Sequence, residues 1–165
     1  YDQPDIAAGA GVIGLEIVED LPGVDTTVVA VGGGGLYTGI AAVAAAHDIK
    51  VVAVEPSKIP TLHNSLIAGQ PVDVNVSGIA ADSLGARQIG REAFGIATAH
   101  PPISVLVDDE AIIAARRHLW DNYRIPAEHG AAAALASLTS GAYKPAADEK
   151  VAVIVCGANT DLTTL

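Results

Sequence analysis

The feature that most constrains the fold is a run of four glycines between two short, uninterrupted apolar segments. The apolar segments are residues 27–31 and 51–54, and a run without polar alternation is typical of a strand that is covered on both faces, as in a parallel sheet. The glycines follow the first segment directly, and an alanine-rich stretch from about residue 37 to residue 47 leads to the second. This order of strand, glycine turn, helix and strand predicts a βαβ unit with a right-handed crossover.

The same alternation of strand-like and helix-like segments continues to the end of the chain. Further helices are predicted at residues 12–20, 62–68, 84–97, 109–123 and 130–139, and further strands at residues 103–107 and 151–155. Arg87 and Arg91 stand four residues apart, which predicts that they share an exposed face of the helix at 84–97. Neither a repeat nor a linker divides the sequence, so we predict one doubly wound α/β domain with a mostly parallel sheet.

Composition limits the classes of function that the chain can have. The 165 residues suit one domain, and with 50% of them hydrophobic but only 4% aromatic, the core is expected to consist of Ala, Val, Ile and Leu. The formal net charge of -10 argues against binding to nucleic acid or to an anionic membrane surface. One cysteine excludes an internal disulfide and a multi-thiolate zinc site. We expect a soluble, cytoplasmic chain without a membrane span.

The start of the sequence predicts a missing segment. The chain contains no methionine and opens with Tyr1 and Asp2, although the initiator methionine is normally removed only before a small residue. We therefore expect the chain to be a piece of a longer protein that lacks an N-terminal part.

Ligands of an open parallel sheet bind beyond the carboxyl ends of its strands. The residues expected at that edge are the glycines, Glu55, Asp108 and residues 156–161. Glycines in such a place form an anion cradle, because the backbone turns sharply and aims successive N–H groups at one phosphate, helped by the positive end of the following helix. Neither a Gly-Lys-Ser/Thr sequence nor a Gly-x-Gly-x-x-Gly frame is present. The pattern predicts a phosphate monoester held by backbone groups; the alternative is a tight turn without a ligand.

Cys156 ends the last predicted strand and has three interpretations. An isolated cysteine is most often a core thiol. It can also be a nucleophile, although no histidine stands close to it in the sequence to activate it. The third interpretation is a hydrogen-bond partner for the nitrogen of a heterocycle.

Several motifs together resemble one enzyme family. Residues 8–16, Ala-Gly-Ala-Gly-Val-Ile-Gly-Leu-Glu, are similar to the AGxGTxGLE stretch of fold-type II pyridoxal-phosphate enzymes, and more narrowly of the serine/threonine dehydratases (ammonia-lyases) and their relative serine racemase. The remaining motifs follow in the family's order and approximate spacing: residues 32–36, 54–56, 81–83, 128 and 156–159. The resemblance covers essentially the whole chain, and it implies that residues 1–165 are the C-terminal part of the cofactor-binding large domain.

The resemblance implies pyridoxal 5'-phosphate as the cofactor and assigns residues to it. Its phosphate would be bound by the backbone N–H groups of Gly32, Gly33, Gly34, Gly35 and Leu36. Cys156, followed by Gly157, matches the position that holds Ser, Thr or Cys opposite the pyridine nitrogen. A neutral partner does not keep that nitrogen protonated, which suits β-elimination better than transamination.

Glu128 matches the family's glutamate near the cofactor ring. The family commonly has Glu-Pro-x-Gly at this place, whereas this chain has Glu128-His129-Gly130. The alternative interpretation is a carboxylate that is favoured by the positive end of a helix. The Ala-Asp-Gly segment of the family corresponds to residues 81–83, where Ser83 replaces the glycine, and we expect only a minor role for Asp82.

The resemblance also implies a cation site. Glu55 and the carbonyl of Ile59 match two ligands of the divalent-cation site of serine racemase-like members, but Thr61 stands where those members have an aspartate. Losing a charged oxygen ligand weakens a site for Mg²⁺ or Ca²⁺. A divalent ion, a monovalent ion and no metal all remain open.

The catalytic lysine of the family has no counterpart here. The four lysines are Lys50, Lys58, Lys144 and Lys150, and none of them is expected near the glycines. In the family, the Schiff-base lysine belongs to the N-terminal half, so we assign no catalytic residue to this chain and expect it to be inactive by itself.

Two classes of function follow. The first is part of a dehydratase that removes water and ammonia from L-threonine or L-serine to give a 2-oxo acid, with serine racemase or threonine synthase-like activity as alternatives within the family. The second is a non-catalytic fragment that binds a phosphate ligand. The expected partners are the N-terminal half of the same enzyme, an amino-acid substrate and further copies in a homo-oligomer.

Overall fold

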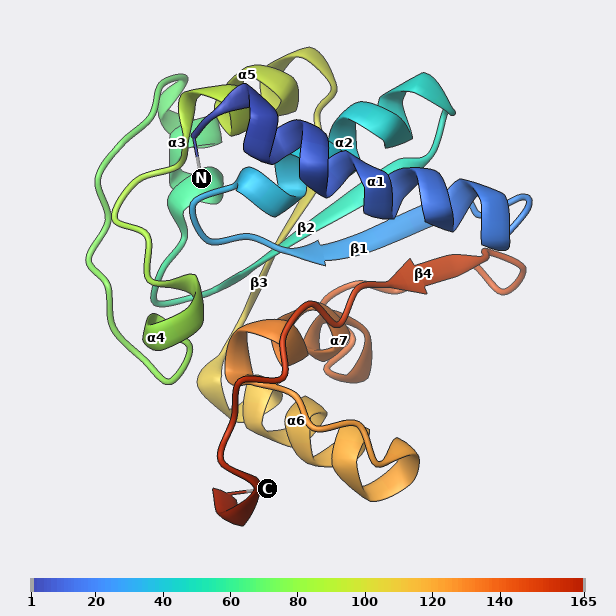
Figure 1. Ribbon diagram of the computed structural model, residues 1–165. Coiled ribbons are helices and arrows are strands. Elements are labelled where there is room, and N and C mark those ends of the chain that lie inside the picture. Colours follow the sequence, from blue (N-terminus) through green and yellow to red (C-terminus); the bar gives the residue numbers. More distant parts are fainter. Residues whose placement is uncertain (1, 165) are drawn as a thin grey trace.

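In the computed structural model, which describes residues 2–164, the strands form a four-stranded, all-parallel sheet (Figure 1). The strands are β1 (Thr26–Ala30), β2 (Lys50–Pro56), β3 (Ile103–Val107) and β4 (Val151–Val153), in the order β3-β2-β1-β4. The chain moves outward from β1 to β2 and β3, and then returns to the other side of β1. The carboxyl ends of β1 and β4 therefore flank the topological switch point, where ligands of such sheets bind.

Helices cover both faces of the sheet, which confirms the doubly wound prediction (Figure 1). One face carries α1 (Pro4–Asp20), α2 (Gly35–Ala46), α3 (Thr61–Ala68) and α5 (Arg91–Ala99), and the other carries α6 (Asp109–Tyr123) and α7 (His129–Thr139). Two short helices, α4 (Ala81–Leu84) and the 3-10 helix η1 (Leu162–Thr164), lie outside these layers. Of the described residues, none forms a helix long and apolar enough to span a membrane.

Burial on both faces explains why residues 28–31, from the middle of β1 onward, are all apolar. Val28 and Ala30 pack into the core under α6 and α7, whereas Val29 and Val31 pack into the core under α2 and α5. Successive side chains of a strand point to opposite faces, so a sheet that is covered on both faces favours apolar residues at successive positions. The aliphatic core that the composition predicts is present: every buried hydrophobic residue of the described chain except Tyr37 is aliphatic.

Helix α1 is longer than predicted because its glycines are packing positions. The helix begins at Pro4, eight residues before the predicted start, and proline is favoured in the first turn of a helix. A Cβ atom on Gly39 of α2 would lie 2.2 Å from the carbonyl oxygen of Ala7, and one on Gly14 would lie 2.9 Å from Cβ of Val43. The glycines of residues 8–16 thus let α1 and α2 approach each other closely.

The predicted helix at residues 84–97 is wrong in its first half. Helix α4 ends at Leu84, and α5 begins only at Arg91. The extended connection between them is tied to other loops, since the Gly90 N–H donates to the Gly33 carbonyl at 3.0 Å and the Arg87 carbonyl accepts from Val74 at 2.8 Å. Arg87 and Arg91 therefore do not share a helix face.

The other predicted elements are close to those observed. Strand β3 has the predicted bounds, and β4 ends two residues before its predicted end. Asp108 caps α6 as expected, because its carboxylate accepts the N–H of Ala111 at 2.8 Å.

Candidate functional site

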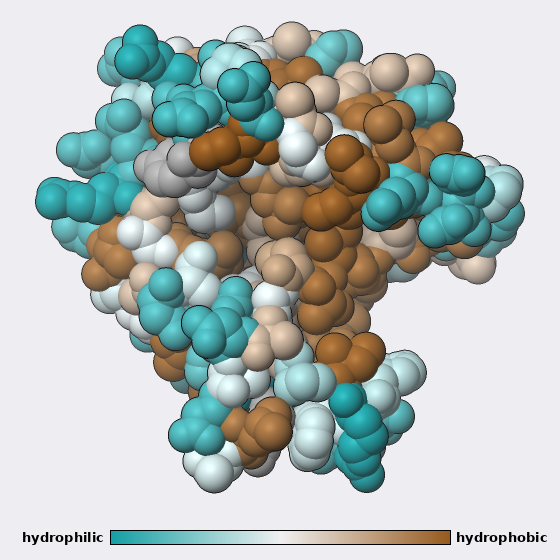
Figure 2. Space-filling view, viewed as in Figure 1, coloured by the Kyte–Doolittle hydropathy of each residue, from teal (hydrophilic) through white to brown (hydrophobic). Residues whose placement is uncertain are grey.

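The carboxyl ends of β1 and β4 open into a cavity of about 620 Å³. The glycine loop, which we define as residues 32–36, forms one wall, and residues 154–156 after β4 form the opposite wall. Ile6 and Ile13 of α1 and Leu84 of α4 close the sides. Apolar surface lies below α1 in the view of Figure 2. The fold thus brings the two predicted groups, the glycines and Cys156, to one cavity at the switch point.

The glycine loop presents unpaired backbone donors. Within residues 2–164, no protein acceptor takes the N–H groups from Gly32 to Leu36; the first N–H group of α2 with a partner is that of Thr38, which donates to the Gly34 carbonyl at 2.8 Å. The first turn of α2 also contains no acidic side chain and receives no side-chain cap. Free N–H groups at the positive end of a helix favour an anion, as the sequence predicts.

Two glycines of the loop are required by the backbone around them. Gly34 has a φ of 95°, and a Cβ atom there would lie 2.4 Å from Cβ of Ala93. A Cβ atom on Gly32 would lie 3.1 Å from Cα of Leu84. The loop is therefore held closely against α4 and α5, and larger residues do not fit without a shift of the backbone.

Neither Thr38 nor any lysine lines the cavity. The Thr38 hydroxyl donates to the Gly34 carbonyl at 2.7 Å, within the first turn of α2. Lys58 pairs with Asp109 at 2.7 Å, and Lys50 lies 3.5 Å from Glu149.

Cys156 faces the cavity beside Glu128. The Glu128 N–H donates to the Gly157 carbonyl at 3.1 Å, and a Cβ atom on Gly157 would lie 2.2 Å from the Glu128 carboxylate. Desolvation, and to a smaller extent the Glu128 charge, raises the pKa of the Cys156 thiol. A thiol with a raised pKa stays protonated at neutral pH, which disfavours a nucleophile and favours a neutral hydrogen-bonding partner.

Glu128 lies at the start of a helix, as one of its two interpretations predicts. It is the N-cap residue of α7, although its side chain makes no capping hydrogen bond. The carboxylate lies instead against Gly157, next to the residue that faces the cavity. A role near a cofactor ring stays a prediction.

Glu55 is a fully buried carboxyl group whose oxygen atoms are used by the protein. Its Oε1 accepts from the Leu62 N–H at 2.7 Å, and its Oε2 accepts from the His63 N–H at 2.8 Å. Burial raises its pKa to about 7, and these hydrogen bonds oppose that shift. Ile59 is buried too, and its carbonyl accepts from Thr61 at 3.0 Å. No cluster of three or more His, Cys, Asp or Glu residues suited to a metal ion occurs among residues 2–164, and the cation site at Glu55 and Ile59 stays a prediction.

Sequence analysis missed Arg116, whose hydrogen bonds connect the segment that precedes Glu128 with residues 160–164, which follow the Cys156 wall. This nearly buried arginine of α6 donates from Nε to the Ala127 carbonyl at 2.9 Å and from Nη2 to the hydroxyl groups of Thr160 and Thr164. One signal was available: Arg116 falls four residues after Ile112, on the apolar stripe of an amphipathic helix. Burial, followed by the Arg116 charge, lowers the pKa of the neighbouring His129.

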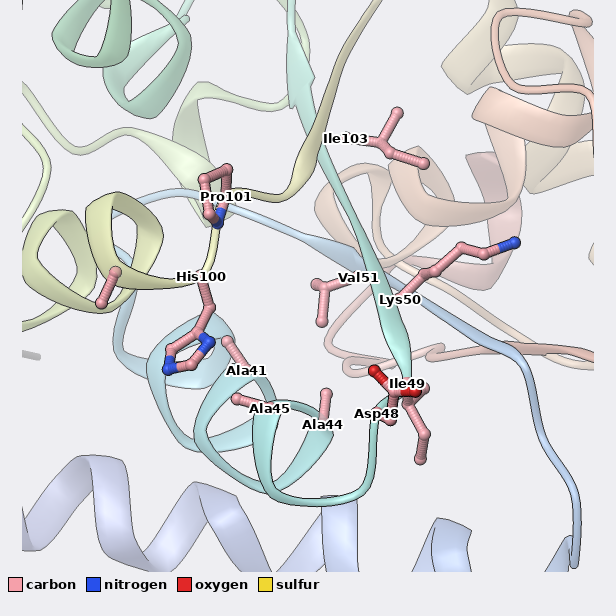
Figure 3. A pocket seen from close by; sticks show the side chains of 11 residues that line it. Ala41, Ala44, Ala45, Asp48, Ile49, Lys50, Val51, His100, Pro101 and Ile103 are labelled. Carbon is pink, nitrogen blue, oxygen red and sulfur yellow. The ribbon is translucent and has the colours of Figure 1, made fainter.

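A second cavity, of about 410 Å³, lies at the other end of the sheet (Figure 3). Lys50 and Ile103, the first residues of β2 and β3, line it together with His100 and alanines of α2. The amino ends of the strands meet here, and none of the predicted site residues is present. The cavity at the switch point therefore remains the candidate site.

Comparison with known proteins agrees with this geometry. Residues 1–157 match the family described as pyridoxal-phosphate dependent enzyme. The biosynthetic L-threonine dehydratase of Pasteurella multocida is 34% identical over all of this chain, which spans 33% of that protein. A solved threonine deaminase from Solanum lycopersicum superposes with a TM-score of 0.91 at 31% identity, over 99% of this chain and 49% of that one. Maize serine racemase gives a TM-score of 0.89 at 30% identity, over 96% and 51%.

These matches cover nearly the whole sequence, and the matched structures share its parallel sheet. The chain itself spans only a third to a half of the relatives named above. The chain belongs to the family of fold-type II pyridoxal-phosphate dependent enzymes.

Proposed function

We propose that this chain is part of an L-threonine/L-serine dehydratase that uses pyridoxal phosphate to remove water by β-elimination and to release ammonia, leaving a 2-oxo acid. The observation that carries the proposal is the row of unpaired N–H groups at the switch point, opposite a neutral cysteine. The relatives support the same activity, because they include L-threonine dehydratases and a phenylserine dehydratase of Ralstonia pickettii.

The residues present fit the cofactor. The glycine loop lines the cavity with backbone N–H groups that have no acceptor within residues 2–164, as a phosphate monoester needs, and close packing against α4 and α5 leaves no room for a side chain at Gly32 or Gly34. Cys156 on the opposite wall provides a neutral group for the ring nitrogen. When bound, pyridoxal phosphate supplies an electron sink for the electron pair that is left at the α-carbon of the substrate. Apolar residues of α1 exclude water from one side of the cavity.

The lysine that attaches the cofactor and moves the α-proton would come from another part of the full-length protein. The chain has surfaces for such a part: Ile6, Val12 and Leu15 of α1 each keep about half of their surface exposed. Strand β4 lies at the edge of the sheet and is only partly buried. Exposed apolar residues and an open sheet edge favour association, either with the N-terminal half or with further copies.

Serine racemase activity is the second candidate, because serine racemases from maize and Dictyostelium discoideum superpose on nearly all of the chain with TM-scores of 0.89 and 0.84. The residues that choose between elimination and racemisation lie largely outside this chain. A non-catalytic fragment that binds a phosphate ligand is the alternative outside the enzyme class.

The test uses the full-length protein with added pyridoxal phosphate. Borohydride reduction followed by mass spectrometry should show the cofactor attached to a lysine outside residues 1–165. Assays should show 2-oxobutanoate from L-threonine and pyruvate from L-serine. Formation of D-serine without a 2-oxo acid would assign the racemase instead. A protein that binds phosphate compounds but gives no reduced adduct and no product would be the non-catalytic alternative.

A further inference from the structure

We propose that Thr61 is a positioning residue for the glycine loop: its hydroxyl group holds the Gly32 carbonyl and thereby aims the Gly33 N–H group at the phosphate. The inference rests on the proposed function, because it assigns a role to a residue that lies behind the cofactor's phosphate cradle. Thr61 would not touch the cofactor and would act only through the loop.

The first argument is the contact itself. Thr61 is fully buried at the start of α3, and its Oγ1 lies 2.8 Å from the Gly32 carbonyl oxygen and 2.8 Å from Oε1 of Glu55. The hydroxyl group carries one hydrogen, for which these two oxygen atoms are the acceptors, and its bond to the Gly32 carbonyl reaches the glycine loop from a different element. It links the loop after β1 to the buried carboxyl group at the end of β2.

The second argument is the geometry of a peptide group. The structure contains no cis peptide bond among the described residues, and in a trans peptide the carbonyl and the following N–H point in opposite directions within one plane. A donor that holds the Gly32 carbonyl on one side therefore directs the Gly33 N–H to the other side. That N–H has no acceptor within residues 2–164, and Gly32 and Gly33 line the cavity.

The third argument is the flexibility of the loop. A peptide between two glycines rotates more freely than any other, because neither residue has a Cβ atom to restrict φ and ψ. An N–H group that must meet a phosphate in a fixed direction therefore needs an external constraint, and Thr61 provides one on the carbonyl side.

The fourth argument is that Thr61 is itself held in place. Its carbonyl accepts the Ser65 hydroxyl at 2.7 Å, and the next two N–H groups of α3 donate to Glu55. A threonine has few χ1 rotamers because its Cβ is branched. The hydroxyl group that contacts the Gly32 carbonyl is thus fixed in position by the first turn of α3, whose N–H groups donate to Glu55.

The test compares Thr61→Val, which removes the hydroxyl at constant shape, with Thr61→Ser, which keeps it, in the full-length protein. Thr26→Val is the matched control, because Thr26 is also a fully buried threonine and its hydroxyl bonds Glu149 at the opposite end of the sheet. Each variant is titrated with inorganic phosphate and with pyridoxal phosphate by calorimetry, and its unfolding by urea is measured separately.

We expect Thr61→Val to weaken the binding of both ligands by about tenfold or more, since the hydrogen bond from the Gly33 N–H to the charged phosphate loses its alignment. Thr61→Ser should stay within about twofold of the wild type, and Thr26→Val should lose stability without losing affinity. If Thr61→Val does not fold, Thr61→Ala takes its place in the same comparison.

The outcomes separate this inference from the proposed function. Wild-type affinity for phosphate in a folded Thr61→Val would overturn the positioning role, whatever the enzyme's activity. Thr61-dependent phosphate binding in a protein without dehydratase activity would support the positioning role and refute the dehydratase. Wild-type protein that binds neither ligand would overturn both.

Discussion

Substituting Gly34 by alanine should damage the glycine loop far more than the same change at Gly69. Both glycines lie at helix ends with positive φ, 95° for Gly34 and 69° for Gly69. The left-handed conformation costs an alanine about 1–2 kcal/mol at either place. Only at Gly34 does the new Cβ atom meet other atoms, at 2.4 Å from Cβ of Ala93 and 2.9 Å from Cδ1 of Ile89, whereas nothing lies within 4 Å at Gly69.

Overpacking of that kind adds about 1–3 kcal/mol. We therefore expect Gly34→Ala to lower the free energy of unfolding by about 2–5 kcal/mol and Gly69→Ala by about 1–2 kcal/mol. Urea denaturation of the full-length protein measures both, and titration with pyridoxal phosphate should show weaker binding in Gly34→Ala alone. Equal losses of stability in the two variants, with unchanged cofactor affinity in Gly34→Ala, would refute the packing argument.

Three further predictions concern other residues. Arg116→Met should lower the free energy of unfolding by about 2–3 kcal/mol, because buried acceptors lose their donor. The control is Arg117→Met, on the exposed side of the same helix, which should change the free energy of unfolding by less than about 0.5 kcal/mol. Similar losses of stability in the two variants, measured by urea denaturation, would contradict this prediction. Hydrogen bonds from Thr26, Tyr143 and a backbone N–H hold the pKa of Glu149 at about 2, below its ordinary value of 4.5. Its contribution to stability is therefore present above pH 4.5 and is lost as the pH falls toward 2, so Glu149→Gln should flatten the acid side of the stability profile; an unchanged slope in urea titrations at several pH values would count against it. Cys156→Ser should keep dehydratase activity, whereas Cys156→Asp should lower kcat at least about tenfold because a carboxylate keeps the ring nitrogen protonated. Steady-state assays with L-threonine measure kcat of both variants. A fully active Cys156→Asp would disprove the argument that the ring nitrogen needs a neutral partner.

The elements that the sequence predicts well are those whose pattern follows from burial alone. Residues 28–31 are all apolar because helices cover both faces, and the predicted strand at residues 27–31 lies within one residue of β1. Local chemistry is also sufficient at Asp108, where an acidic residue precedes a helical pattern and caps α6.

The elements that sequence analysis misplaced depend on contacts between distant segments. The helix predicted at residues 12–20 begins at Pro4, and its glycines Gly11 and Gly14 are positions where α2 packs closely against it. Residues 85–90 read as helix, yet their backbone donates to and accepts from loops that sequence pattern does not locate. Arg116, and the bond of Thr61 to the glycine loop, were missed for the same reason, since the acceptor oxygen atoms come from other elements.

Among the described residues, three helices follow strands at the carboxyl-end edge of the sheet, and the N-terminus of only one of them is free of a protein carboxylate. Strands β1, β2 and β3 are each followed by a helix whose first N–H groups have no partner within the helix. After β2, Glu55 accepts N–H groups of α3, and after β3, Asp108 caps α6. After β1 no carboxylate takes this place: α2 starts from glycines without an acidic residue in its first turn. The uncapped helix is also the one beside the switch point, where the glycine loop and residues 154–156 line the cavity. A protein carboxylate satisfies the helix start after β2 and after β3, whereas the start of α2 has no such carboxylate within the described chain, so we propose the glycine loop, and not Glu55 or Asp108, as the anion site.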